Sequence, residues 1–167
     1  MHIIKYLDKT PTISSTAKVF EGAVIAGDVT LKDNVNIWFN VTIRADMAEV
    51  VIGENTNIQD NTVIHTNLGL PTVIGKNVTV GHGAIIHAST VEDNALIGMG
   101  SIILDGALIE EGALVGAGSV VPPNKVIPKN HLAIGNPIKI IRELSKEDLK
   151  GIALNKDYYL KLTKEYQ

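Results

Sequence analysis

Aliphatic residues recur along the chain at intervals of six positions, in four runs separated by short breaks in register. The runs begin at Ile13, Ile52, Ile74 and Val91, and the last continues to Ala133. A period of six is neither the 3.6-residue repeat of an amphipathic helix nor the two-residue alternation of a strand. It predicts a short strand and a turn in each hexad, with one aliphatic side chain directed inward.

Three such hexads would close one triangular coil of about 18 residues, and coils stacked at about 4.8 Å would form a parallel β-helix. The alternative is a β-sandwich of short strands, but sandwiches do not keep a six-residue register over so long a stretch. The predicted fold class is therefore an all-β solenoid of hexapeptide repeats.

The C-terminal part of the chain departs from the repeat. Pro137 is expected where the chain leaves the coils, and Ser145 followed by Asp148 is typical of a helix N-cap with its acidic partner. Apolar residues at helical spacings then predict a helix over about residues 145–165. We therefore expect two parts, a β-helix domain over 1–140 and a C-terminal helix, 141–167, packed on the solenoid.

The breaks in the six-residue register indicate where loops protrude. Three residues are added between the first and second runs, four between the second and third, in TNLGLPT, and one is missing between the third and fourth. Insertions in a solenoid map to loops, often on its functional side.

Composition narrows the classes of function. The chain has 167 residues, a net charge of −3 and a pI of about 5.9, so it lacks the basic footprint of a nucleic-acid-binding protein. The absence of cysteine excludes disulfides and thiolate metal sites. We see no signal-peptide pattern and no apolar run long enough for a membrane span, so we expect a cytoplasmic protein with no membrane partner.

Three histidines become a candidate metal site once the hexads are stacked into coils. The hexads at Ile43, Ile64 and Ile86 are expected on one side, so the outward residues that follow them form a column of Arg44, His65 and His87. Two histidines one coil apart can share a metal ion.

His82 belongs to a different side of the predicted prism, with Asp60 one coil below it and Gln59 beside Asp60. One chain is therefore not expected to close a three-histidine site, whereas a ring of three chains would form three equal sites. Three imidazoles with one open position suit Zn²⁺, the expected ion. Imidazole also binds Fe²⁺ and Co²⁺, which remain alternatives.

Two segments, NVTIRADMAEVVIGENTNIQDNTVIHT and TVIGKNVTVGHGAIIHAST, resemble the γ-class carbonic anhydrase-like family of hexapeptide-repeat proteins. The Arg-x-Asp, Asn-x-Gln-Asp and three-histidine spacings carry the resemblance, which extends over about residues 10–165. It implies a left-handed β-helix and a homotrimer whose metal sites are shared between neighbouring chains. The implied metal ligands are His65, His82 and His87.

The resemblance also implies roles for residues around the metal. Arg44 and Asp60 match an ion pair between subunits, and Gln59 matches the residue that hydrogen-bonds the metal-bound water. Asp46 and Asn57 match supporting positions in the same motif.

Many members of this family direct a tyrosine of the C-terminal helix toward the site. Tyr159 matches it, and the adjacent Tyr158 is the alternative.

The implied function is that of a carbonic anhydrase-like metalloenzyme, a lyase that reversibly hydrates CO₂ to bicarbonate with a metal-bound hydroxide. Slow turnover is expected, because Met47 replaces a glutamate of the most active members and the loop TNLGLPT contains no acid. The alternatives are a metal-dependent acyl-CoA thioesterase, a CoA-dependent hexapeptide acyltransferase and a non-catalytic scaffold subunit. The sequence does not separate a thioester substrate from CO₂.

Overall fold

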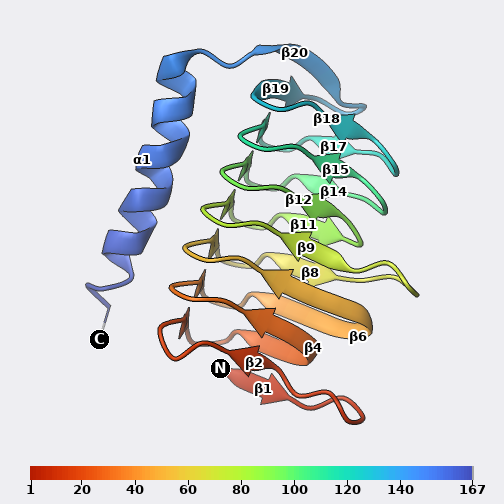
Figure 1. The fold of residues 1–167 in the computed structure, drawn as a ribbon, viewed down its shortest axis with the longest axis vertical. Coiled ribbons are helices and arrows are strands. Elements are labelled where there is room, and N and C mark those ends of the chain that lie inside the picture. The colour runs from red at the N-terminus through yellow and green to blue at the C-terminus, as the bar shows by residue number, and fades with distance from the viewer. Residues whose placement is uncertain (167) are drawn as a thin grey trace.

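Short strands stack in register along three faces of a parallel β-solenoid, which makes about seven turns (Figure 1). The computed structural model describes residues 1–166, and within them one α-helix, α1 (Lys146–Leu162), lies along the solenoid. The predicted fold class is confirmed. The proposed division at residue 140 stays a prediction, and its last residue, 167, lies outside the described part.

Each face is a ladder of parallel strands, and two long strands, β4 (Val24–Leu31) and β6 (Thr42–Ile52), cross from the first face to the second. The first face also contains β1 (His2–Ile4), β8 (Val63–His65), β11 (Ile85–His87), β14 (Ile102–Ile103) and β17 (Val120–Val121). The second face also contains β2 (Thr12–Ile13), β9 (Thr72–Ile74), β12 (Thr90–Val91), β15 (Leu108–Ile109) and β18 (Val126–Ile127).

The third face is a separate sheet that ends in an antiparallel strand. Its strands are β3 (Lys18–Val19), β5 (Asn36–Ile37), β7 (Asn57–Ile58), β10 (Thr79–Val80), β13 (Leu96–Ile97), β16 (Leu114–Val115), β19 (His131–Ile134) and β20 (Lys139–Glu143). β20 pairs with β19 antiparallel, so it ends the parallel stack and leads the chain to α1.

The core consists of the aliphatic residues that the six-residue period singles out. From Ile25 to Ala133 every one of them is buried, with at most 1% of its surface exposed, and only the first two, Ile13 and Val19, are partly exposed. Pairs such as Ile43 with Ile64 and Ile64 with Ile86 lie directly above one another. The predicted stacking of hexads is therefore the observed one.

An asparagine ladder stabilises one corner of the solenoid. Asn34, Asn55, Asn77 and Asn94 all have positive φ angles, which asparagine tolerates better than most residues. The side-chain amide of each of the first three donates to the side-chain oxygen of the next, at 3.2–3.3 Å. The same side chain therefore permits the turn and links successive coils.

Helix α1 packs on the third face and is anchored at both ends. Ser145 caps its N-terminus in a reciprocal capping box with Asp148. Near its C-terminus, Tyr159 and Tyr166 contact Trp38, with ring centroids 5.5 Å apart in each pair. The helix predicted over about 145–165 is thus present, and Phe20, Trp38 and Phe39 of the first coils form an aromatic cluster with Tyr166.

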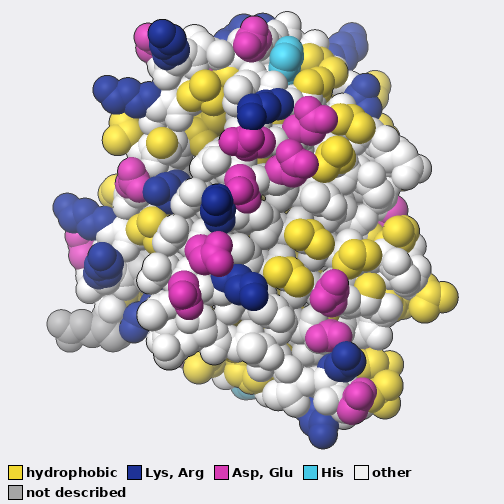
Figure 2. Space-filling view, in the orientation of Figure 1, with side chains coloured by type: hydrophobic (Ala, Val, Ile, Leu, Met, Phe, Trp, Pro, Cys, Tyr) yellow, Lys and Arg dark blue, Asp and Glu magenta, His cyan; other side chains and the backbone are white. Residues whose placement is uncertain are grey.

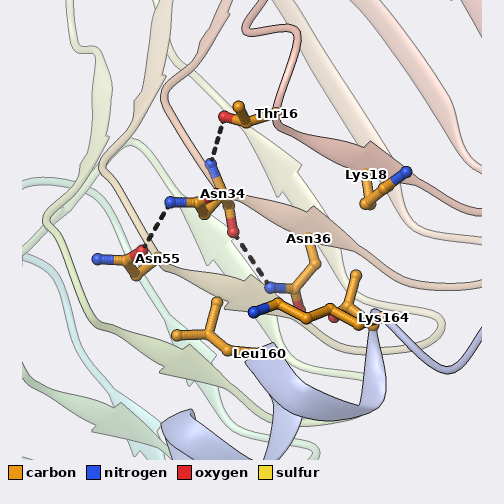
Figure 3. A pocket seen from close by; sticks show the side chains of 8 residues that line it. Thr16, Lys18, Asn34, Asn36, Asn55, Leu160 and Lys164 are labelled. Carbon is orange, nitrogen blue, oxygen red and sulfur yellow. Dashed lines mark hydrogen bonds between the residues drawn. The ribbon is translucent and has the colours of Figure 1, made fainter.

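A cavity of about 240 Å³ lies where the last turns of α1 meet the first coils (Figure 3). Its two basic side chains, Lys18 and Lys164, extend in different directions in this view, and the three histidines of the predicted metal site do not line it. The cavity therefore results from helix packing and is distinct from the predicted site.

Acidic and basic side chains are mixed along the solenoid wall (Figure 2), as in the ion pairs Lys76–Asp93 and Lys129–Glu111. Across residues 1–166, no helix has the length and apolar character needed to cross a bilayer.

The asparagine ladder generates a stability prediction. Asn77→Ala is expected to lower the free energy of unfolding by about 2 kcal/mol, because alanine disfavours positive φ and both ladder bonds are lost. Asn77→Gly loses the same bonds but accepts the backbone angle, so its loss should be smaller. Urea denaturation of both variants measures the difference, and equal losses would contradict a role for the backbone angle.

Candidate metal centre

All three register breaks lie at the corner between the first and second faces. There β6 runs through its extra residues without a break, loop 66–71 separates β8 from β9, and Ala88, with a φ of +44°, makes the short turn between β11 and β12. The N-terminal hairpin, closed by a bridge between Tyr6 and Lys9, lies at the same corner (Figure 1). Extra chain therefore gathers around one edge of the solenoid.

The predicted column lies at this corner. Arg44 pairs in register with His65, and His65 pairs with His87 one coil further. The two imidazoles face each other, with His65 Nδ1 3.2 Å from His87 Nε2. Both rings are partly buried, with 14% and 30% of their side-chain surface exposed.

An aspartate holds the outer nitrogen of each ring. His65 Nε2 lies 3.0 Å from an oxygen of Asp46, and His87 Nδ1 is in hydrogen-bond contact with Asp105. Since an ionised carboxylate only accepts hydrogen bonds, the histidine nitrogens are the donors.

Each of these aspartates is fixed by a second donor. Arg44 bonds the other oxygen of Asp46, and Asn67 Nδ2 donates to the other oxygen of Asp105 at 2.7 Å.

Both aspartates have pKa values below the ordinary value for a carboxyl group. Burial raises the pKa of Asp46, but hydrogen bonds from His65 and Arg44 outweigh it. The hydrogen bond from Asn67, followed by that from His87, lowers the pKa of Asp105. Two anionic acceptors therefore flank the histidine pair at neutral pH.

Asp105 and Asn67 are the residues of this cluster that the sequence analysis missed. Asp105 lies outside the segments that carry the family resemblance. The length of one coil, about 18 residues, could have identified it, because residue 105 follows His87 by about one coil and lies at the same corner. Asn67 belongs to loop 66–71, which has no repeat register to place it.

The third histidine lies apart from the pair. His82 occupies the turn between β10 and β11, before the first residue of β11, whereas His87 is the last residue of that strand. The side chain of His82 is 45% exposed. Its Nδ1 donates to Asp60 at 2.8 Å, and the hydroxyl of Tyr159 lies 3.3 Å from its Nε2. Burial raises the pKa of Tyr159, with a further contribution from the charge of Asp60.

Of the two tyrosines considered, Tyr159 is the one next to His82. Tyr158 has 59% of its surface exposed.

Gln59 and Asn57 lie on the third face. Gln59 is 4% exposed and donates to Asn57 Oδ1 at 3.1 Å, while Asn57 donates to Thr79 at 2.8 Å. These bonds hold the amide of Gln59 in the turn that also carries Asp60, immediately below His82.

One chain thus presents two separate clusters. One contains Arg44, Asp46, His65, His87, Asn67 and Asp105, and the other contains Asp60, His82 and Tyr159. Arg44 and Asp60 are bonded to partners in their own clusters, so their pairing across subunits stays a prediction. Within the described chain, no group of three histidine or acidic side chains is arranged to hold a metal ion.

Segments of the chain are similar in sequence to known proteins. A family described as bacterial transferase hexapeptide (six repeats) matches residues 88–123. A carbonic anhydrase of Geobacillus kaustophilus is 47% identical over 58 residues, which is 35% of this chain and 32% of that protein. The match thus spans about a third of the length of this curated relative.

Solved structures match over nearly the whole chain. A candidate acetyltransferase of Bacillus cereus is 43% identical, with a TM-score of 0.97 over 99% of this chain and 96% of that one. A hexapeptide transferase family protein of Anaplasma phagocytophilum is 39% identical, with a TM-score of 0.96 over 99% and 98% of the two chains. The chain belongs to the family of hexapeptide-repeat proteins, and its similarity to carbonic anhydrases extends over about a third of its length.

Proposed function

We propose that the protein is a metal-dependent, carbonic anhydrase-like enzyme whose site forms between two copies of the chain. The observation that carries this proposal is the histidine pair, in which His65 Nδ1 and His87 Nε2 face each other at 3.2 Å. Aspartates take the N–H of the other nitrogen in each ring. In the neutral imidazoles, both inner nitrogens therefore present lone pairs to one another.

Two facing lone pairs repel unless a cation lies between them. Ligand nitrogens about 2.0–2.1 Å from a tetrahedral zinc ion are about 3.3 Å apart, close to the observed separation. Metal-bound histidines commonly donate their other N–H to a carboxylate. The donor set and its hydrogen bonds therefore fit zinc, and Fe²⁺ or Co²⁺ could bind the same nitrogens.

We assign the third ligand to His82 of a second copy. Its Nδ1 is held by Asp60 in the same manner, which leaves Nε2, beside the hydroxyl of Tyr159, to bind a metal. A contact between the His82 corner of one chain and the His65 corner of the next is heterologous, and threefold closure gives a homotrimer. Outward apolar side chains on the first face, Val63 and Ile85, about 40% exposed, support burial against another copy.

Zinc held by the three histidines would supply the Lewis acidity that makes a water ionise near neutral pH. The chain's own groups would then orient CO₂ and move the proton that this water releases. Gln59, fixed by Asn57, is assigned to orient the attacking water, and the neutral phenol of Tyr159 can donate a hydrogen bond to bicarbonate. Arg44 is half exposed and could reach Asp60 of the neighbouring copy.

A second candidate is acyl transfer from an acyl-coenzyme A with release of coenzyme A, since the Bacillus cereus relative is a candidate acetyltransferase. Hydrolysis of a thioester at the same metal is a related possibility. Acetyl-CoA turnover, with and without an amine acceptor, separates these reactions from CO₂ hydration. Release of CoA with no CO₂ hydration by the zinc-loaded protein would favour the second candidate.

The first test concerns the two-chain site. His82→Ala and His65→Ala should each remove nearly all bound zinc, because each loses one of three ligands. When the two variants are refolded together, some interfaces combine the intact His65 of one chain with the intact His82 of the other. Elemental analysis should then show partial recovery of zinc, and His131→Ala is the matched control. Full zinc occupancy in His82→Ala alone would contradict the shared site.

The second test concerns proton release. Met47, 48% exposed beside Asp46, and Leu68, 83% exposed in loop 66–71, lie where a carboxylate could accept the proton produced by hydration. Without such a group the proton must leave on buffer, so kcat should rise with imidazole concentration.

Met47→Glu should raise kcat several-fold and weaken this dependence while zinc content stays constant. Met47→Gln controls for shape and polarity. A high wild-type kcat that is indifferent to buffer would show that another group carries the proton.

A further inference from the structure

We propose that Asp105 is a positioning residue for His87, and that Asn67 holds Asp105 in place and thereby couples loop 66–71 to the metal ligands. The inference rests on the proposed function in so far as it concerns a metal. It concerns residues that lie outside the histidine motif and that reach the site only through the fold.

The contacts leave the Asp105 carboxylate little freedom. One oxygen accepts from His87 Nδ1 and the other from Asn67 Nδ2 at 2.7 Å, so rotation of the carboxylate would break at least one bond. Asp105 lies in the turn between β14 and β15, one coil beyond His87. Its backbone is tied into the stack, because Asn124 N donates to its carbonyl at 2.9 Å.

The bond from His87 fixes which ring nitrogen carries the proton. Because Asp105 accepts, the proton belongs on Nδ1, and the lone pair of Nε2 points toward His65. Asp46 imposes the complementary state on His65, with the proton on Nε2. The two aspartates therefore act as a matched pair that presents both inner nitrogens as ligands.

Asn67 extends this arrangement into the loop. Its side-chain oxygen accepts from the backbone N–H of Leu68 at 2.8 Å, and its backbone pairs with Leu70. The amide that holds Asp105 is thus fixed by the loop's own hydrogen bonds. The loop is long enough to protrude because of its four extra residues, and its tip, Leu68, is 83% exposed.

Zinc affinity, measured by competition with a chromogenic chelator, is the first readout. Asp105→Ala should weaken affinity by about 10- to 100-fold, the usual effect of removing the hydrogen-bond partner of a metal-bound histidine. Asp105→Asn keeps an acceptor oxygen and should restore most of the loss, and Asn67→Ala should have a smaller effect than Asp105→Ala. Asp93→Asn, at a partly exposed aspartate paired with Lys76, is the matched control and should not change affinity.

The second readout is the tautomer of His87 in metal-free protein, measured by ¹⁵N NMR at pH 8.5, about two units above the reference pKa of a free histidine. His87 should carry its proton on Nδ1 in the wild type and lose this preference in Asp105→Ala. His131 is an internal control, because its Nδ1 donates to the carbonyl of Lys129 at 2.8 Å and should keep its proton in every variant.

The two readouts separate failure of this inference from failure of the proposed function. If the wild type binds no zinc but the His87 tautomer depends on Asp105, the positioning role stands and the metal proposal fails. If zinc binds and neither affinity nor tautomer responds to Asp105→Ala, the positioning role is wrong while the metal proposal stands.

Discussion

The structure depends on burial of one aliphatic side chain in every hexad of the solenoid. Each buried Ile, Leu or Val contributes roughly 1.5–3 kcal/mol relative to an exposed one, and dozens of hexad and corner positions act together. Because side chains alternate across a strand, a shift of one residue would turn Arg44, His65 and His87 into the core. The cost of burying these polar groups is therefore what holds the three side chains in a column on the outer surface.

The same constraint explains why the site lies at one corner. Extra or missing residues within a face would displace inward aliphatics, whereas residues added at a corner leave the ladders on either side in register. β6 and loop 66–71 both place their insertions between the first and second faces. Strand ends and loops at this corner can therefore carry Asp46 and Asn67 to the histidine pair while the core remains regular.

Much of this arrangement could be predicted from the sequence because it follows the repeat. The three-faced solenoid, the buried hexads and the stacking of Arg44, His65 and His87 derive from counting in sixes. The C-terminal helix follows instead from its capping residues and the helical spacing of its apolar side chains. Asp105 was missed because a linear motif does not display contacts one coil apart. The contact between Tyr159 and His82 could not be derived from the repeat, since it depends on how α1 packs across the third face.

The central claim is that two copies of the chain complete a metal site that one chain only begins. A single chain presents two of the proposed ligands at one corner and the third at the next corner, in the turn that precedes β11. Native mass spectrometry of zinc-loaded protein measures both quantities together, the number of chains and the number of ions in each species. Trimers carrying three zinc ions and monomers carrying none are the expected species. Monomers that retain zinc, or trimers that bind none, would contradict the central claim.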